Sequence, residues 1–152
     1  MARIEASIEI AASPTTVFRF CHDFDRWPEW DDRVVGVELI TTKPLRTGSL
    51  IRIDAGRSGQ YSFTWDAEYT SYQYPGGSTI KVLDAAPSSP FKSGSEAWQL
   101  TRTADGTRFT LIWDYQPRGI IARIADALGR RAGTRRAIQH SLENLQALIE
   151  AG

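Results

Sequence analysis

Six aromatic side chains recur at alternating positions of three segments, and two of them carry a hydroxyl group that could take part in chemistry. The six are Phe63, Trp65, Tyr69, Trp98, Trp113 and Tyr115. Tyrosine and tryptophan have polar tips that a dry core accommodates poorly, so as a group these residues indicate a ligand cavity, although any one of them fits a plain core equally well. Tyr69 and Tyr115 could hydrogen-bond a carbonyl or phenol, or act as an acid in enol or aldol chemistry.

Arg52 stands between two isoleucines, and its role depends on the register of its strand. If Ile51 and Ile53 face inward, Arg52 is solvated, which is the commoner arrangement. In the opposite register Arg52 would be a buried cation that polarises a ligand oxygen. The sequence offers no convincing inward carboxylate, so Tyr69, Tyr115 and Arg52 are the only candidates for catalysis.

Patterns typical of metal ligands, nucleophiles and phosphate loops are missing. His22 and His140 are the only histidines, and neither is spaced with cysteines or carboxylates as metal ligands are. Cys21, the only cysteine, has no evident base beside it and is expected to be a buried, inert thiol. The glycines at 56–59 and at 76–77 are typical of hairpin turns, and no Gly-x-Ser-x-Gly elbow occurs. We therefore expect neither a metal nor a cofactor.

An arginine-rich segment lies between two parts of the C-terminal apolar stripe. It contains Arg130, Arg131, Arg135 and Arg136, with Gly129 and Gly133 among them. A solvated helix face explains the arginines most simply, and the alternative is contact with an anionic head group, a membrane surface or a protein partner at the mouth of a cavity. Each glycine weakens a helix by about 1 kcal/mol relative to alanine, which suits ligand entry, while close packing explains the glycines equally well.

The block from Asp23 to Asp32 places two tryptophans after a short helix. Trp27 and Trp30 could form an entrance wall of the cavity, or a hydrophobic plug between the short helices and the end of the sheet. Asp31 and Asp32 are expected to be solvated.

Alternation of apolar and polar residues predicts seven strands, which must position these side chains. The strands span residues 3–10, 34–41, 50–55, 60–71, 78–83, 93–103 and 107–116. In the fourth strand Tyr61, Phe63, Trp65, Ala67 and Tyr69 share one face. The sheet should therefore have one dry face and one wet face. Segment 87–90 is expected to be a loop or bulge.

Two short helices and one long helix complete the prediction. Ser13 suits an N-cap and Pro14 a first helical position, and Pro28 limits a second helix to residues 25–30. After Gly119 the apolar period lengthens to that of one long amphipathic helix. Its stripe contains Ile121, Ile124, Leu128, Ile138, Leu142, Leu145 and Ile149. We expect an α+β fold in which a curved antiparallel sheet wraps around this helix, with Leu128 as a further ligand contact.

Composition bounds the class of protein. The chain has 152 residues, which suits a single domain over 1–152, with 18 basic and 18 acidic residues. This balance gives no reason to expect nucleic-acid binding. No secretory signal pattern or membrane-spanning run is evident, and a lone cysteine suits the reducing cytoplasm. The sequence does not decide between a monomer and a homodimer.

The chain resembles the START/Bet v 1-like (SRPBCC) superfamily of helix-grip proteins, and within it the bacterial polyketide cyclase/dehydrase and lipid-transport group. The resemblance covers nearly the whole chain and rests on Ile8–Ile10, Ser13-Pro14, Val17-Phe18, the 23–30 block, Gly106-Thr107 and the 141–145 segment. It implies a cavity between the sheet and the C-terminal helix that takes lipids, polyketides or other apolar aromatics. It transfers no catalytic motif, because the matching residues are structural.

Two functions follow as hypotheses. The first is binding, carriage or sequestration of a hydrophobic small molecule in an internal cavity. The second is a cofactor-independent polyketide cyclase, aromatase or dehydratase that uses the cavity tyrosines or Arg52.

Overall fold

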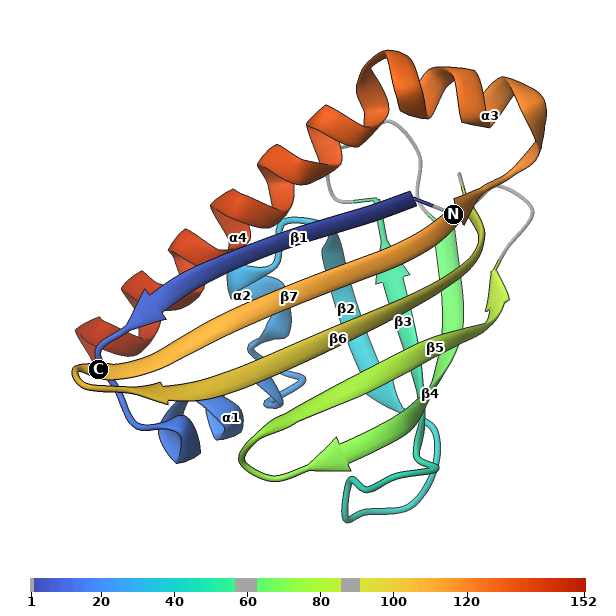
Figure 1. Cartoon of the computed structure of the whole chain (residues 1–152). Coiled ribbons are helices and arrows are strands. Elements are labelled where there is room, and N and C mark those ends of the chain that lie inside the picture. The colour runs from blue at the N-terminus through green and yellow to red at the C-terminus, as the bar shows by residue number, and fades with distance from the viewer. Residues whose placement is uncertain (1, 57–62, 86–90) are drawn as a thin grey trace.

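Seven antiparallel strands form one curved sheet, with a long helix across it (Figure 1). The computed structural model describes residues 2–56, 63–85 and 91–152. The strands are β1 (Ala2–Ile10), β2 (Val34–Leu39), β3 (Leu50–Ala55), β4 (Phe63–Gln73), β5 (Gly77–Ala85), β6 (Phe91–Thr103) and β7 (Gly106–Pro117). Their order in the sheet is β1-β7-β6-β5-β4-β3-β2. The predicted α+β helix-grip fold is confirmed.

Strand β7 shows how the alternating pattern becomes a two-faced sheet. It pairs with β1 on one side and β6 on the other over nearly its whole length. Phe109, Leu111, Trp113 and Tyr115 on one face are buried, and the residues between them are partly exposed. Side chains two residues apart share a face, so the sequence alternation transfers directly to the concave face of the sheet.

Two short helices, α1 (Pro14–Cys21) and α2 (Trp27–Trp30), follow β1 as predicted. The Ser13 hydroxyl accepts a hydrogen bond from the Thr16 backbone N–H at 3.3 Å and so caps α1. Cys21 faces the core at the end of α1 and is fully buried. Burial raises the pKa of its thiol well above the usual value and so disfavours the reactive thiolate. The sequence did not predict a base beside it, but His22 Nδ1 lies 3.4 Å from Cys21 Sγ.

The C-terminal helix runs along the sheet beside β1 (Figure 1). It is α4 (Arg131–Ala151), and Ile138, Leu142, Leu145 and Ile149 are its buried apolar residues. These four residues form the second half of the predicted stripe, and they close the core over the end of the sheet that carries α1 and α2.

The prediction of one continuous long helix from Gly119 is wrong. A separate helix α3 (Gly119–Ala125) leads through a π-helical turn, η1 (Asp126–Arg130), into α4, and Gly129 in that turn has a non-helical φ of 178°. None of the residues of α3 is buried, and Asp126 is the only buried residue of η1. Ile121, Ile124 and Leu128 therefore face solvent, because the break at Gly129 directs this segment away from the sheet.

Some sequence predictions fall on residues outside the described part of the chain. These are Tyr61, most of the turn at 56–59 and the loop at 87–90. Strand β2 ends at Leu39, two residues earlier than expected. Within the described ranges, no helix has the length and apolarity needed to span a membrane.

Candidate functional site

A cavity of about 590 Å³ lies between the concave face of the sheet and the segment formed by η1 and α4. Strands β3 to β7 supply its apolar wall, which includes Ile53, Trp65, Ile80, Phe91 and Trp113. The helical side supplies Asp126, Arg130, Gly133, Thr134 and Ala137. This volume lies within the range of small-molecule sites, and the mixture of an apolar wall with a few polar groups is typical of them.

The aromatic wall owes its shape to a glycine behind it. Trp113 stacks on Tyr115, with ring centroids 5.6 Å apart, and meets Phe91 edge-on at 5.2 Å. Its indole lies directly over Gly94 of β6, where an added Cβ would come within 2.3 Å of Trp113 Cη2. Gly94 therefore leaves the space in which the Trp113 indole lies.

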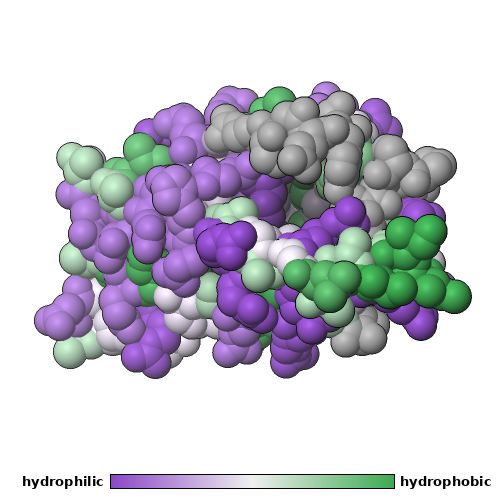
Figure 2. Space-filling view, turned by 90° about the horizontal axis from the view of Figure 1, so that it is seen from above, coloured by the Kyte–Doolittle hydropathy of each residue, from purple (hydrophilic) through white to green (hydrophobic). Residues whose placement is uncertain are grey.

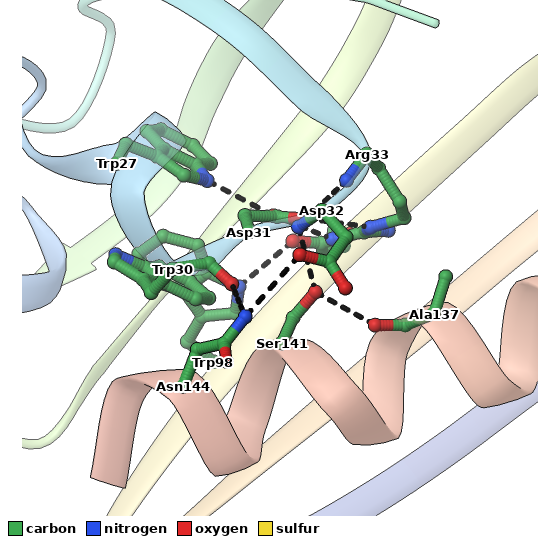
Figure 3. Close-up of polar contacts among 10 residues, drawn as sticks. Trp27, Trp30, Asp31, Asp32, Arg33, Trp98, Ala137, Ser141 and Asn144 are labelled. Carbon is green, nitrogen blue, oxygen red and sulfur yellow. Dashed lines mark hydrogen bonds and ion pairs between the residues drawn. The ribbon is translucent and has the colours of Figure 1, made fainter. Parts of the chain in front are cut away.

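A buried ion cluster forms a polar patch on the cavity wall. Arg33 donates to Asp31 through Nε (3.0 Å to Oδ1) and Nη2 (2.9 Å to Oδ2), and to Glu96 Oε1 through Nη1 at 2.9 Å. Trp27 Nε1 donates to Asp31 Oδ2 at 3.0 Å, and Trp98 Nε1 donates to Glu96 Oε2 at 2.8 Å. Figure 3 shows Trp27 and Arg33 pointing toward Asp31 above α4.

The charges of this cluster are fixed by their mutual contacts. Burial opposes charge on Asp31, but the attraction of Arg33 and hydrogen bonds from Arg33 and Trp27 outweigh it and hold the pKa of the Asp31 carboxyl below its usual value. Burial likewise opposes charge on Arg33, and Asp31 and Glu96 together raise its pKa above the usual value. The guanidinium has five N–H bonds, so two of them have no partner in the part of the chain described here.

A second polar group lies where η1 meets the sheet. The Tyr115 hydroxyl donates to Asp126 Oδ1 at 2.5 Å, and Arg131 Nε donates to Asp126 Oδ2 at 2.9 Å. Burial, followed by the hydrogen bond to Asp126, raises the pKa of Tyr115 to about 12. Tyr115 is therefore protonated at neutral pH and acts as a donor.

Hydrogen bonds to α4 hold the segment that carries Arg33 in place. The Asp32 backbone N–H donates to Ser141 Oγ at 2.8 Å, and Asn144 Nδ2 donates to the Trp30 carbonyl at 3.2 Å (Figure 3). His140 pairs with the Asp32 carboxylate, and this contact raises the pKa of His140. The polar patch is thus positioned by the same helix that covers the core.

A comparison of the chain with models of known families gives one match. The family described as "Polyketide cyclase / dehydrase and lipid transport" has a model that matches residues 1–150. The chain belongs to this family. The predicted superfamily resemblance is thereby confirmed. No curated protein matches the chain.

Solved structures share the family's fold over the whole chain. TTHA0849 from Thermus thermophilus superposes with a TM-score of 0.81 at 17% identity, covering 99% of this chain and 98% of its own. The Zhui aromatase/cyclase from Streptomyces sp. R1128 has a TM-score of 0.78 at 16% identity, covering 98% and 93%. Ara h 8.0201 has a TM-score of 0.69 at 8% identity, covering 99% of both chains. At these identities the likeness shows a common fold only.

Four of the predicted ligand contacts lie in the cavity wall. They are Phe63, Trp65, Trp113 and Tyr115. Their part in binding stays a prediction, which the cavity geometry supports. Trp27 also lines the cavity, whereas Trp30, stacked on it with ring centroids 6.3 Å apart, belongs to the buried plug. The pair therefore forms a buried plug, of which Trp27 contributes one side to the cavity wall, while its predicted place at the entrance stays a prediction.

The other predicted site residues lie outside the cavity wall. Trp98 is buried behind it, and its contribution is the hydrogen bond to Glu96. Tyr69 is buried, its hydroxyl has no hydrogen-bond partner among the described residues, and burial raises its pKa well above the usual value. Leu128 is 82% exposed, because the break at Gly129 turns it outward.

Arg52 is solvated, which is one of the two arrangements that the sequence allows. Ile51 and Ile53 face the core, while Arg52 pairs with Asp66 at 2.9 Å on the outer face of the sheet. A role in polarising a ligand in the cavity is thereby excluded.

The polar side of the site was missed by sequence reasoning. Asp31 was expected to be solvated but is fully buried, and the expected lack of an inward carboxylate is wrong for Glu96 and Asp126, which are 4% and 2% exposed. One signal was available, because Glu96 lies on the same strand face as Trp98, which was placed inward. Within the described residues, no group of His, Cys, Asp and Glu side chains is arranged to hold a metal ion.

Proposed function

We propose that this protein binds an amphipathic small molecule with an apolar, aromatic or lipid-like body and one polar end. The observation that carries the proposal is a cavity of about 590 Å³ with an aromatic wall and the buried Arg33–Glu96 pair on that wall. The body would lie against Trp65, Phe91 and Trp113, where its apolar surface leaves water.

The polar end would be recognised by two complementary groups. The free N–H bonds of Arg33 can donate to a carbonyl or carboxylate oxygen, and each Glu96 oxygen accepts only one bond within the described chain, so a lone pair remains for a ligand hydroxyl. A ligand with a hydroxyl next to a carbonyl would satisfy both groups. An entirely apolar ligand would cover these polar groups without replacing their hydrogen bonds, which disfavours it.

Native mass spectrometry of freshly purified protein, followed by titration with 8-anilinonaphthalene-1-sulfonate, tests the proposal. Trp27, Trp65 and Trp113 line the cavity, so a bound probe should quench their fluorescence. Ala137→Phe would fill part of the cavity and should abolish quenching. Ala132→Phe is the matched control, because the same change on the exposed side of α4 should leave quenching intact. Equal quenching in both variants would refute binding in the cavity.

A second candidate function is cyclisation of a polyketide chain without a cofactor. It is favoured by carboxylates that the sequence did not predict in the cavity, above all Glu96 beside Arg33. Glu96 would accept the proton from the carbon between two carbonyls, and Arg33 would stabilise the enolate oxygen that forms. The enolate carbon would then attack a distant carbonyl, whose oxygen takes up a proton. Tyr115, which stays protonated, is the available donor.

Turnover of a linear poly-β-ketone thioester separates the two functions. If the protein is a cyclase, Glu96→Gln should lower kcat by a factor on the order of 100 or more and leave binding of the fluorescent probe largely unchanged. If the wild-type protein forms no cyclised product but still binds the probe in the cavity, only the binding function is supported.

A further inference from the structure

The segment formed by α3 and η1 carries an apolar surface that nothing in the described part of the fold covers. Ile120, Ile121 and Leu128 are 74%, 85% and 82% exposed, and Ile124 is 53% exposed. Asp126, the one buried residue of this segment, points inward to Tyr115, so the isoleucines and Leu128 occupy the outer side. Figure 2 shows a hydrophobic patch over this end of the molecule, beside a hollow.

Positive charge is concentrated in this segment and in the residues next to it, including the start of α4. Between residues 118 and 136 there are six arginines and one acidic residue, Asp126. The chain as a whole has 18 basic and 18 acidic residues, so the remainder holds five more acidic than basic residues. Among the described residues no carboxylate forms an ion pair with Arg123, Arg130, Arg135 or Arg136, and Arg131 alone pairs with Asp126. Four arginines of this end therefore have no carboxylate paired with them in the described part of the chain.

We infer that the α3–η1 segment docks the protein on an anionic lipid membrane, with its isoleucines and Leu128 in the acyl boundary and the arginines of this segment and of the start of α4 at the phosphate groups. An apolar helix face flanked by arginines has the composition of an interfacial helix. Arginine side chains reach the head-group level while their stems stay on apolar surface. Anionic lipids supply the charge that complements this end.

A second copy of the chain fits this surface less well. A symmetric dimer through the apolar face would bring two sets of six arginines together, with one acidic residue on each side to offset them. An anionic membrane presents the opposite charge and accepts the same apolar side chains.

The position of this surface suits an exchange of ligand with the bilayer. Asp126 and Arg130 of η1, followed by Gly133 and Thr134 of α4, also line the cavity. The membrane-docking face and the cavity wall are thus two sides of one short segment. The inference needs no particular ligand and is independent of whether the protein carries or cyclises one.

Flotation with vesicles tests the docking directly. The wild-type protein should bind vesicles of phosphatidylcholine and phosphatidylserine in equal parts much more tightly than vesicles of phosphatidylcholine alone, and added salt should weaken the binding. Arg135→Gln with Arg136→Gln should weaken binding roughly 25-fold, because each arginine near such a surface contributes roughly fivefold. Ile121→Ser with Leu128→Ser should weaken it by about tenfold or more.

Matched controls use exposed residues far from this end. Ile40→Ser replaces an isoleucine that is 44% exposed and lies just after β2, beside the start of β3. Arg102→Gln removes an exposed arginine next to the β6–β7 hairpin, at the opposite end of the sheet from α3 (Figure 1). Both controls should bind vesicles as the wild type does, and all variants should keep the wild-type thermal midpoint. Three results would overturn the inference: no binding to anionic vesicles, equal loss in the controls, or a dimer in light scattering that Ile121→Ser with Leu128→Ser dissociates.

Discussion

Replacing Arg33 by methionine should remove a large part of the stability of this protein. Methionine keeps most of the side-chain volume but leaves Asp31 and Glu96, whose side chains are 0% and 3% exposed, without their shared cation. Breaking a buried ion pair by removing one partner costs about 3–5 kcal/mol, because an uncompensated charge remains. At an m-value of about 2 kcal/mol per molar urea, the unfolding midpoint should fall by roughly 2 M.

Urea unfolding followed by tryptophan fluorescence measures this cost at neutral pH. Arg108→Met provides the matched control, because Arg108 forms an ion pair with Glu9 at 2.7 Å on the surface, where both side chains are more than half exposed. Exposed pairs contribute little, so the midpoint of this variant should stay close to that of the wild type. A shift in Arg33→Met no larger than that in Arg108→Met would refute the reasoning.

The pH dependence of the Arg33→Met effect has a definite sign. In the wild type Arg33 holds the pKa of Asp31 below its unfolded value, so the stability that Asp31 contributes is present above that unfolded value, about 3.9, and is lost as the pH falls through the folded pKa. In the variant the attraction of Arg33 is lost and burial is opposed only by the remaining hydrogen bonds, so the pKa of Asp31 is higher than in the wild type and the folded variant takes up a proton at a higher pH. The difference in unfolding free energy between the two proteins should therefore narrow on acidification, and a constant difference would contradict the argument.

Three further changes have expected outcomes. Gly94→Ala should displace the Trp113 indole into the cavity and cost about 1–3 kcal/mol; a wild-type unfolding midpoint and unchanged probe binding would count against it. Burial lowers the pKa of His22 from 6.5 to about 4. The free energy of unfolding of the wild type should therefore fall by up to roughly 3 kcal/mol as the pH falls between these two values, since only the unfolded chain takes up the proton. Urea unfolding of His22→Gln at a series of pH values should show a smaller loss of unfolding free energy over this pH range. An equal loss in the variant and the wild type would exclude His22 as its source. Tyr115→Phe removes the donor at 2.5 Å from Asp126 and should cost about 1.5–3 kcal/mol in urea unfolding; a smaller cost than for an exposed tyrosine would contradict this role.

The apolar half of the site was predictable because it follows from local alternation. Trp65 lies in β4, and Trp113 and Tyr115 lie in β7, at positions where the period of two decides the face without reference to any other strand. The order of strands and helices, and with it the α+β class, follows from the same local patterns. The need to cover one dry sheet face with one helix predicts the curvature, and the resemblance to a superfamily implies the cavity.

The polar half depends on contacts between residues far apart in sequence. Arg33 meets Glu96 across 63 positions, and only the curvature of the complete sheet brings them together. Sequence reasoning predicts a solvated Asp31 because aspartate is usually exposed, and its burial becomes favourable only with Arg33 and Trp27 as partners. The prediction for the first half of the helical stripe was wrong for another reason. Periodicity shows which residues share a face, but it does not show whether another element packs against that face.

The burial of Cys21 makes this chain unusually convenient for site-directed labelling. It is the single cysteine of the sequence, and burial both shields its thiol and disfavours the reactive thiolate. A cysteine introduced at the exposed Ile121 or Leu128 would therefore be the one thiol that a maleimide dye or nitroxide reaches, with no background to remove first. Electron paramagnetic resonance at such a position could report how deeply the α3–η1 segment enters an anionic membrane.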